Sequence, residues 1–188
     1  MSDNAALTNP TVKGVGVVLR PFKRADIGLI EEVAADPYIP LIARIPPDFT
    51  VANGAAFLDA QAERAASGRG FSLAIADTTT DRAYGQISLW LADLSSGRAA
   101  LSYWISQSAR GHHRAAEGLA LLSDWAFRHH PLHRLTLYIE PWNTASIRTA
   151  LRAGYEEEGL LRRWQLVGTE SKDALIFAML RADEIQCD

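Results

Sequence analysis

Five consecutive residues could together hold an anion: Arg110, Gly111, His112, His113 and Arg114. They lie between a predicted strand and a predicted helix. A helix that begins directly after a short glycine-containing loop points several backbone N–H groups, and the positive end of its dipole, at one place. The arginines add fixed charge and the histidines can add partial charge, so the loop suits a pyrophosphate. A plain strand-to-helix connection with solvated basic side chains explains the same residues equally well.

A second polar group follows the next predicted strand, where Glu140 is succeeded by Asn143 and Ser146. Asn143 and Ser146 fall in the first turn of a predicted helix. Ligands of open sheets bind at the carboxyl ends of parallel strands, which is where these three side chains should meet. Taken alone, Asn143 is explained as a helix cap and Ser146 as a surface residue.

The elements around these residues predict a parallel pair of strands. Alternation favours a strand over residues 99–105, a helical period follows over residues 114–127, and alternation returns over residues 135–139. A strand-helix-strand unit makes its two strands parallel. Residues 71–75 and 84–91 also alternate, so they join the strand at 99–105 in an antiparallel meander.

The rest of the chain completes a mixed sheet. Further helices are expected at residues 24–36, 50–68 and 143–154, further strands at 16–21, 155–164 and 174–180, and a proline-rich loop at 40–47. The predicted fold class is therefore α/β, a single domain with a mixed, mostly antiparallel sheet, a central parallel strand pair and flanking helices. We expect a flexible leader at residues 1–14, the domain at 15–182 and a tail at 183–188.

The composition excludes several other classes of protein. Of the 188 residues 48% are hydrophobic and 22% are charged, so a core can form without disulfides or a structural metal. The single cysteine, Cys187, stands next to the end, which favours an inert thiol over one that carries an acyl group. A net charge of −3 without a dense basic run argues against a nucleic-acid partner. We expect no membrane span and a cytoplasmic protein.

Two motifs follow each other along the chain. The strand sequence Tyr103-Trp104-Ile105 leads into a loop of the form Arg-x-x-His-x-Ala at residues 110–115. The second motif is made by Asn143, Ser146, Leu151, Gly154 and Tyr155. Together they resemble the GNAT superfamily, and within it the RimJ/RimL-like branch of ribosomal-protein N-terminal acetyltransferases. In that family the patterns are Arg/Gln-x-x-Gly-x-Gly/Ala and Asn-x-x-Ser with a Leu-x-x-Gly-Tyr/Phe helix exit, and the resemblance spans residues 17–180.

The resemblance implies a GNAT-like fold and an acyl-CoA-dependent N-acetyltransferase. Such an enzyme moves an acetyl group from acetyl-CoA to a primary amine, directly within a ternary complex and without a metal. The acceptor would be a protein N-terminal α-amine or a small-molecule amine, and the enzyme a monomer or homodimer. The implied cofactor-binding residues are Trp104, Ile105, Ser106, Arg110, Gly111, His112, His113, Arg114, Ala115, Asn143 and Ser146.

The resemblance also implies catalytic roles. Ser146 would protonate the departing sulfur, directly or through water. For the base the sequence leaves Glu140, Tyr103 and the two histidines His112 and His113 open.

Two residues depart from the family pattern. His113 replaces the central loop glycine, which places a side chain at a position that can need a positive φ. Ala100 replaces a glutamate that the family often carries before the Tyr-Trp pair, so no base is carried over there. These departures keep two alternatives open: a GNAT-like protein that binds without acyl transfer, and an acyltransferase that uses another acyl-CoA such as succinyl-CoA.

Overall fold

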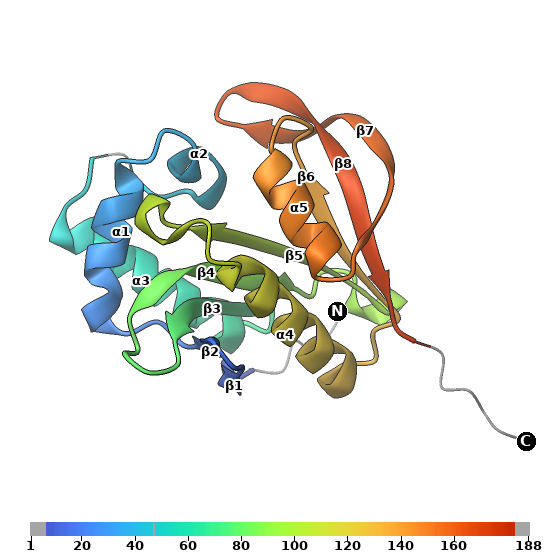
Figure 1. Cartoon of the computed structure of the whole chain (residues 1–188). Helices are drawn as coiled ribbons and strands as arrows, with labels where there is room; N and C mark the ends of the chain where they lie inside the picture. Colours follow the sequence, from blue (N-terminus) through green and yellow to red (C-terminus); the bar gives the residue numbers. More distant parts are fainter. Residues whose placement is uncertain (1–6, 47, 183–188) are drawn as a thin grey trace, which may run out of the picture.

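The computed structural model describes residues 7–46 and 48–182, and within these ranges the strands form one eight-stranded sheet (Figure 1). Its order is β1-β2-β3-β4-β5-β6-β8-β7. The strands are β1 (Val12–Lys13), β2 (Val17–Arg20), β3 (Gly70–Asp77), β4 (Ala83–Trp90), β5 (Arg98–Ile105), β6 (Arg134–Ile139), β7 (Glu156–Val167) and β8 (Glu170–Leu180). Strands β5 and β6 are parallel and the other pairs are antiparallel, which confirms the predicted fold class.

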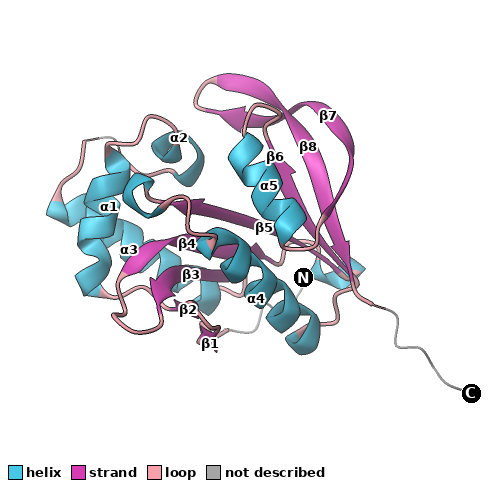
Figure 2. Cartoon of the chain, viewed as in Figure 1, coloured by secondary structure: helices cyan, strands magenta, loops and turns pink. Residues whose placement is uncertain are grey.

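Helices cover both faces of this sheet (Figure 2). They are α1 (Ile27–Ala34), α2 (Ile39–Ala43), α3 (Val51–Ala66), α4 (Arg114–His129) and α5 (Thr144–Arg152), with 3-10 turns η1 (Arg24–Asp26), η2 (Leu94–Ser96) and η3 (Gln107–Ala109). Successive strand residues point to opposite faces, so Leu73 packs in the core with Leu119 of α4, whereas Ala74 packs with Phe57 of α3. Among the described residues, no helix is long and apolar enough to cross a bilayer.

The predicted proline-rich loop at residues 40–47 is wrong in its first half, which belongs to helix α2. Pro40 stands in the first turn of this helix. There the fixed φ of proline suits the helix, and its missing N–H would have had no helical partner. The helix is five residues long and ends at Ala43, and the residue that caps it, Arg44, has a φ of 55°. Pro40 therefore stands at a helix start, whereas Pro46 lies in the loop that follows the helix.

Part of the expected flexible leader is built into the sheet. Val12 and Lys13 form strand β1 along β2, and the Leu7 N–H donates to the Ala65 carbonyl at 2.9 Å. A strand of two residues is too short for alternation to reveal it. Residues 1–6 of the leader, the tail at 183–188 and with it Cys187 lie outside the described residues.

Strands β5 and β6 diverge after a short paired stretch, which opens the centre of the sheet (Figure 1). Their register joins residues 98–100 to residues 134–136. Strand β5 continues to Ile105 and β6 to Ile139. In the described part of the chain, residues 101–105 thus have backbone groups on the β6 side that no strand of the sheet pairs with. A free edge of this kind can accept an extended, amide-bearing ligand.

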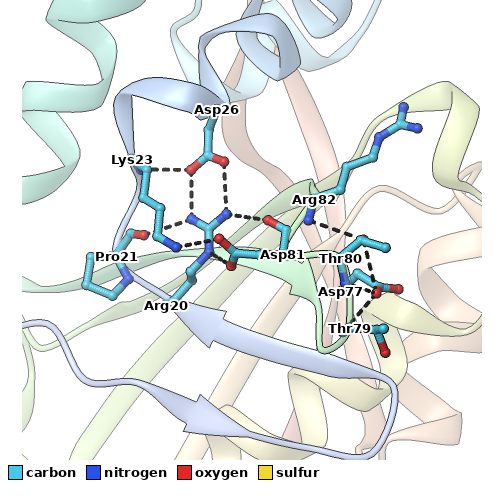
Figure 3. A network of polar contacts seen from close by, with 9 residues as sticks. All are labelled: Arg20, Pro21, Lys23, Asp26, Asp77, Thr79, Thr80, Asp81 and Arg82. Carbon is cyan, nitrogen blue, oxygen red and sulfur yellow. Dashed lines mark hydrogen bonds and ion pairs between the residues drawn. The ribbon is translucent and has the colours of Figure 1, made fainter.

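A buried ion pair fixes the first helical segment to the sheet (Figure 3). Arg20, at the end of β2, donates to both carboxylate oxygens of Asp26 at 2.8 and 2.9 Å. Its Nε donates to Asp81 Oδ1 at 2.6 Å, and Lys23 also pairs with Asp81. The side chains of Arg20 and Asp26 are only 6% and 5% exposed, so losing one charge leaves the other buried without its main partner.

We expect Asp26→Asn to destabilise the protein by about 2–3 kcal/mol, because the amide cannot accept both guanidinium hydrogen bonds. Urea unfolding followed by circular dichroism measures the change. Asp59→Asn is the matched control, since its ion pair with Arg24 is 64–65% exposed and should contribute less than about 1 kcal/mol. Equal losses from the two variants would contradict the anchoring role of Arg20 and Asp26.

Candidate active site

Five of the predicted site residues line one cavity where β5 and β6 diverge: Tyr103, Trp104, Glu140, Asn143 and Ser146. The cavity has a volume of about 590 Å³. That size is within the range of about 300–1,000 Å³ that is usual for small-molecule sites. The cavity therefore brings together groups that the sequence had placed at the ends of two strands and on the following helix.

The hydroxyls of Tyr103 and Ser146 form the closest polar pair in this group. Tyr103 Oη lies 2.7 Å from Ser146 Oγ and 3.2 Å from the Ser146 carbonyl oxygen. Burial raises the pKa of Tyr103, and hydrogen bonds to Ser146 and Thr149 offset this only in part. The phenol consequently keeps its proton at neutral pH, which suits a donor rather than a base.

Asn143 fixes the start of the helix that carries Ser146. Its Oδ1 accepts a hydrogen bond from the Ser146 N–H at 3.1 Å, as the predicted cap requires. Helix α5 ends at Arg152, and the chain turns away at Gly154, which has a φ of 92°. Asn143 thus sets the position of Ser146 through the helix start, and its Nδ2 carries the donors that remain for a ligand.

Glu140 is a buried carboxylate, 4% exposed, at the end of β6. Its Oε1 accepts a hydrogen bond from the Tyr38 hydroxyl, and its Oε2 accepts one from Trp142 Nε1 at 2.9 Å. The Tyr38 and Trp142 rings meet edge to face with centroids 4.9 Å apart. Burial, and next the hydrogen bond to Glu140, raise the pKa of Tyr38, so the phenol stays neutral and continues to donate. Two donors and one aromatic pair thus hold a negative charge at the cavity wall.

The predicted anion loop begins at the end of β5 and leads into α4. Gly111 has a φ of 86°, and nothing lies within 4 Å of the position of an added Cβ. His113, the residue before the first turn of α4, has a φ of 57°, as expected for the position of the missing glycine. His112 and His113 are exposed, and Arg114 and Ala115 are half-buried. The loop is open to solvent on the side of the helix N-terminus.

The two arginines of the loop are tied to the protein itself. Arg110 Nη2 donates to Asp36 Oδ2 at 2.7 Å, while its Nε donates to the Ile105 carbonyl at 3.3 Å. Arg114 Nη1 donates to the Ala109 carbonyl at 3.1 Å. The structure therefore leaves the N–H groups at the start of α4 and the two exposed histidines as the freest anion donors of the loop.

Three predicted residues support the cavity through the backbone or from outside it. Trp104 is 7% exposed, and its Nε1 donates to Gln86 Oε1 at 3.0 Å, so the N–H donor of its indole is already occupied. Ile105 is half-buried at the end of β5. Ser106 is 1% exposed, and its Oγ lies 3.4 Å from Ser108 Oγ.

The sequence-based prediction did not find Tyr38. This residue lies 102 positions from Glu140 along the chain, between the helix expected at residues 24–36 and the loop expected at residues 40–47. The available signal was a single hydroxyl-bearing aromatic between Pro37 and Pro40. That signal becomes meaningful only when the fold places α2 against the end of β6.

Comparison with known proteins identifies the family of this chain. Residues 17–156 match the family model described as an acetyltransferase (GNAT) domain. The chain belongs to the GNAT acetyltransferase family. This GNAT chain is 24% identical over 167 residues to the uncharacterized N-acetyltransferase p20 of Bacillus licheniformis. The aligned part covers 89% of this chain and 94% of the relative.

Solved GNAT structures share the fold. RimJ of Mycobacterium smegmatis, in complex with CoA-disulfide, has a TM-score of 0.73 at 24% identity. The superposition covers 99% of this chain and 92% of the RimJ chain. RimL, the ribosomal L7/L12 alpha-N-protein acetyltransferase in complex with coenzyme A, has a TM-score of 0.76 at 14% identity. The superposition covers 91% of this chain and 98% of the RimL chain.

GNAT membership makes the chain an acyl-CoA-dependent N-acetyltransferase with acetyl-CoA as its co-substrate. The residues of this GNAT protein fit that co-substrate. The open loop before α4 suits the pyrophosphate, and the free edge of β5 suits the amide-bearing arm. Tyr103, on the strand with that free edge, lines the cavity together with Ser146.

Proposed function

We propose that this enzyme acetylates a primary amine by direct transfer in a ternary complex within the cavity between β5 and β6. The observation that supports this most strongly is that two hydroxyls and one buried carboxylate line the same cavity. Tyr103 and Ser146 are hydrogen-bonded to each other, and Glu140 is fixed by Tyr38 and Trp142. This set offers a proton donor for the sulfur and a proton acceptor for the amine.

The proposed chemistry balances within these residues. A bond forms between the amine nitrogen and the acyl carbon, and the bond between that carbon and sulfur breaks. Glu140 takes the proton that the nitrogen loses. The sulfur receives a proton from Ser146, which regains one from Tyr103. Because a thiol has a pKa near ~8.5, the thiolate is already a fair leaving group and the donor pair contributes moderately.

The free edge of β5 supplies the remaining assistance. Backbone groups on the free edge of β5 hold the donor arm and the acyl oxygen, and Asn143 contributes its amide group, whereas the Ser106 N–H already donates to the Tyr84 carbonyl at 2.9 Å. The acceptor is a protein N-terminal α-amine or a small-molecule amine. An α-amine has a pKa near ~7.7–8.0, so a sizeable neutral fraction exists before Glu140 acts. The names of RimJ-like and RimL-like neighbours favour the protein N-terminus as the first class to screen.

A screen of amines with acetyl-CoA tests this proposal. We expect free thiol to be released in the presence of an accepted amine, together with a rise in melting temperature on adding coenzyme A. A ligand at one hundred times its dissociation constant stabilises the folded state by about 2.7 kcal/mol. Stabilisation without thiol release from any amine would favour the binding-protein alternative, and release from succinyl-CoA alone would favour the other acyl donor.

A further inference from the structure

One arginine of the cavity has a positive charge without a carboxylate partner. Arg64 of α3 is half-buried, its Nη1 donates to Ser88 Oγ at 3.0 Å, and its guanidinium lies 4.0 Å from the centre of the Trp90 ring. Within residues 7–46 and 48–182, no Asp or Glu forms an ion pair with it. A guanidinium has five N–H donors, so most of them have no acceptor in the described protein.

A buried network of hydrogen bonds supports Ser88, the residue to which Arg64 donates. Ser88 is 1% and Gln86 is 7% exposed. Gln86 Nε2 donates to Ser88 Oγ and to Gln61 Oε1, each at 3.1 Å, and Gln86 Oε1 accepts from Trp104 Nε1 at 3.0 Å. A fully partnered network of this kind is rigid. Stacking on Trp90 and bonding to Ser88 therefore hold the guanidinium in one place.

The other charges of the cavity do not neutralise Arg64. Arg44 and Arg69 line the same cavity, and Glu140 is the one carboxylate among its described lining residues. Burial, and next the charge of Arg69, lower the pKa of Arg64 to about 10, so the guanidinium remains protonated at neutral pH. The cavity thus has a positive end at Arg64 and a negative point at Glu140.

The positive end lies on the α3 face of the sheet. In the register of β4 and β5, Ser88 stands opposite Ser102 and Ile87 opposite Tyr103. Neighbouring residues of a strand point to opposite faces, so Arg64 and Ser88 lie on the α3 face, whereas Tyr103 points to Ser146 on the α5 face. The anion loop leads into α4, which packs in the same core cluster as α5. Arg64 is consequently placed for a group that enters from the face opposite to the donor.

We propose that the enzyme selects primary amines that also carry a carboxylate, which Arg64 binds while the amine faces Glu140. This inference rests on the proposed function. A half-buried guanidinium without an anion is costly, and a carboxylate matches its planar set of donors. Two sources share this chemistry in the acceptor, namely a free amino acid and a peptide whose first residue is Asp or Glu. A third source would be the acyl group, as in succinyl-CoA.

The test compares matched acceptors with acetyl-CoA by thiol release. The pairs are two short amidated peptides that differ only in an N-terminal Asp or Asn, and free aspartate beside aspartate diamide. We expect the wild type to prefer the acidic member of a pair about 10- to 100-fold in kcat/KM, because a hydrogen-bonded ion pair is lost with the amide. Which pair shows the preference distinguishes peptide from free amino acid.

Arg64→Met should reduce that preference to less than about threefold, and Arg64→Lys should keep part of it. Arg128→Met, on the exposed part of α4, is the control and should keep the wild-type preference. Coenzyme A binding by each variant shows that it is folded.

A preference that survives Arg64→Met would overturn the inference while thiol release still supports acyl transfer. An Arg64-dependent preference for succinyl-CoA with a neutral amine would overturn it by placing the carboxylate on the donor. No release from any amine would overturn this inference and the proposed function together.

Discussion

The Tyr103→Phe enzyme is expected to turn over about 100-fold more slowly than the wild type, with an unchanged Kd for coenzyme A. The phenol is 2.7 Å from Ser146 Oγ, so its loss removes the proton that Ser146 would regain. This effect is at the low end for general acids, since a thiolate leaves readily. Thiol release at saturating acetyl-CoA and amine measures kcat, and calorimetric titration measures the Kd.

The pH dependence provides a second sign for the donor role. Burial raises the pKa of Tyr103 from an ordinary value near 10. An acid must be protonated to act, so activity is present below the folded-state pKa and is lost as pH rises through it. The alkaline limb of wild-type kcat should therefore lie above about pH 10. Tyr103→Phe should lack this limb.

Ser146→Ala tests whether the two hydroxyls act as one unit. If Tyr103 acts through Ser146, the double variant should be about as slow as either single variant, because residues of one relay are not additive. Tyr84→Phe is the matched control, since it removes a phenol that bonds Asp77 instead. A double variant whose loss equals the product of the single losses would show that the hydroxyls work independently. Full turnover in Tyr103→Phe, in an assay limited by chemistry, would remove Tyr103 from the mechanism.

The features of the fold that were predictable are those encoded by neighbouring residues. The cap at Asn143, the helix start at Thr50 and the left-handed His113 each depend on the backbone within three or four residues. The parallel pairing of β5 and β6 followed from the helix between them. Such local signals establish which elements exist and how they are ordered.

The features that were missed depend on residues far apart in the chain. The length over which β5 and β6 pair determines whether a cavity exists, and alternation carries no information about it. The contact of Tyr38 with Glu140 spans 102 residues, and the unpaired state of Arg64 is a property of everything around it. Glu140 itself was predicted as a candidate base, but its burial came from α2 and Trp142 rather than from its own strand.

Glu140→Gln is expected to lower kcat/KM for the amine by about 100- to 1,000-fold at pH 7, since the amide takes no proton from the nitrogen. The shape of the site is nearly kept, but an amide cannot accept from both Tyr38 and Trp142 through two oxygens, as the carboxylate does. Unfolding in urea must therefore be measured alongside, with an expected cost of about 1–3 kcal/mol.

The pH profile separates a lost base from a distorted site. Without Glu140 the reaction depends on amine that is already neutral in solution, so the rate of the variant should rise about tenfold per pH unit up to the amine pKa near ~8. The wild-type rate should depend on pH less steeply over the same interval.

Tyr38→Phe leaves the carboxylate in place and removes one of its hydrogen-bond donors. Because it disturbs only the position of the charge, we expect about a tenfold loss with a profile parallel to the wild type. If the pH profile of Glu140→Gln were also parallel to that of the wild type from pH 6.5 to 9.5, the carboxylate would be a structural anchor for α2, and bulk water would be the base.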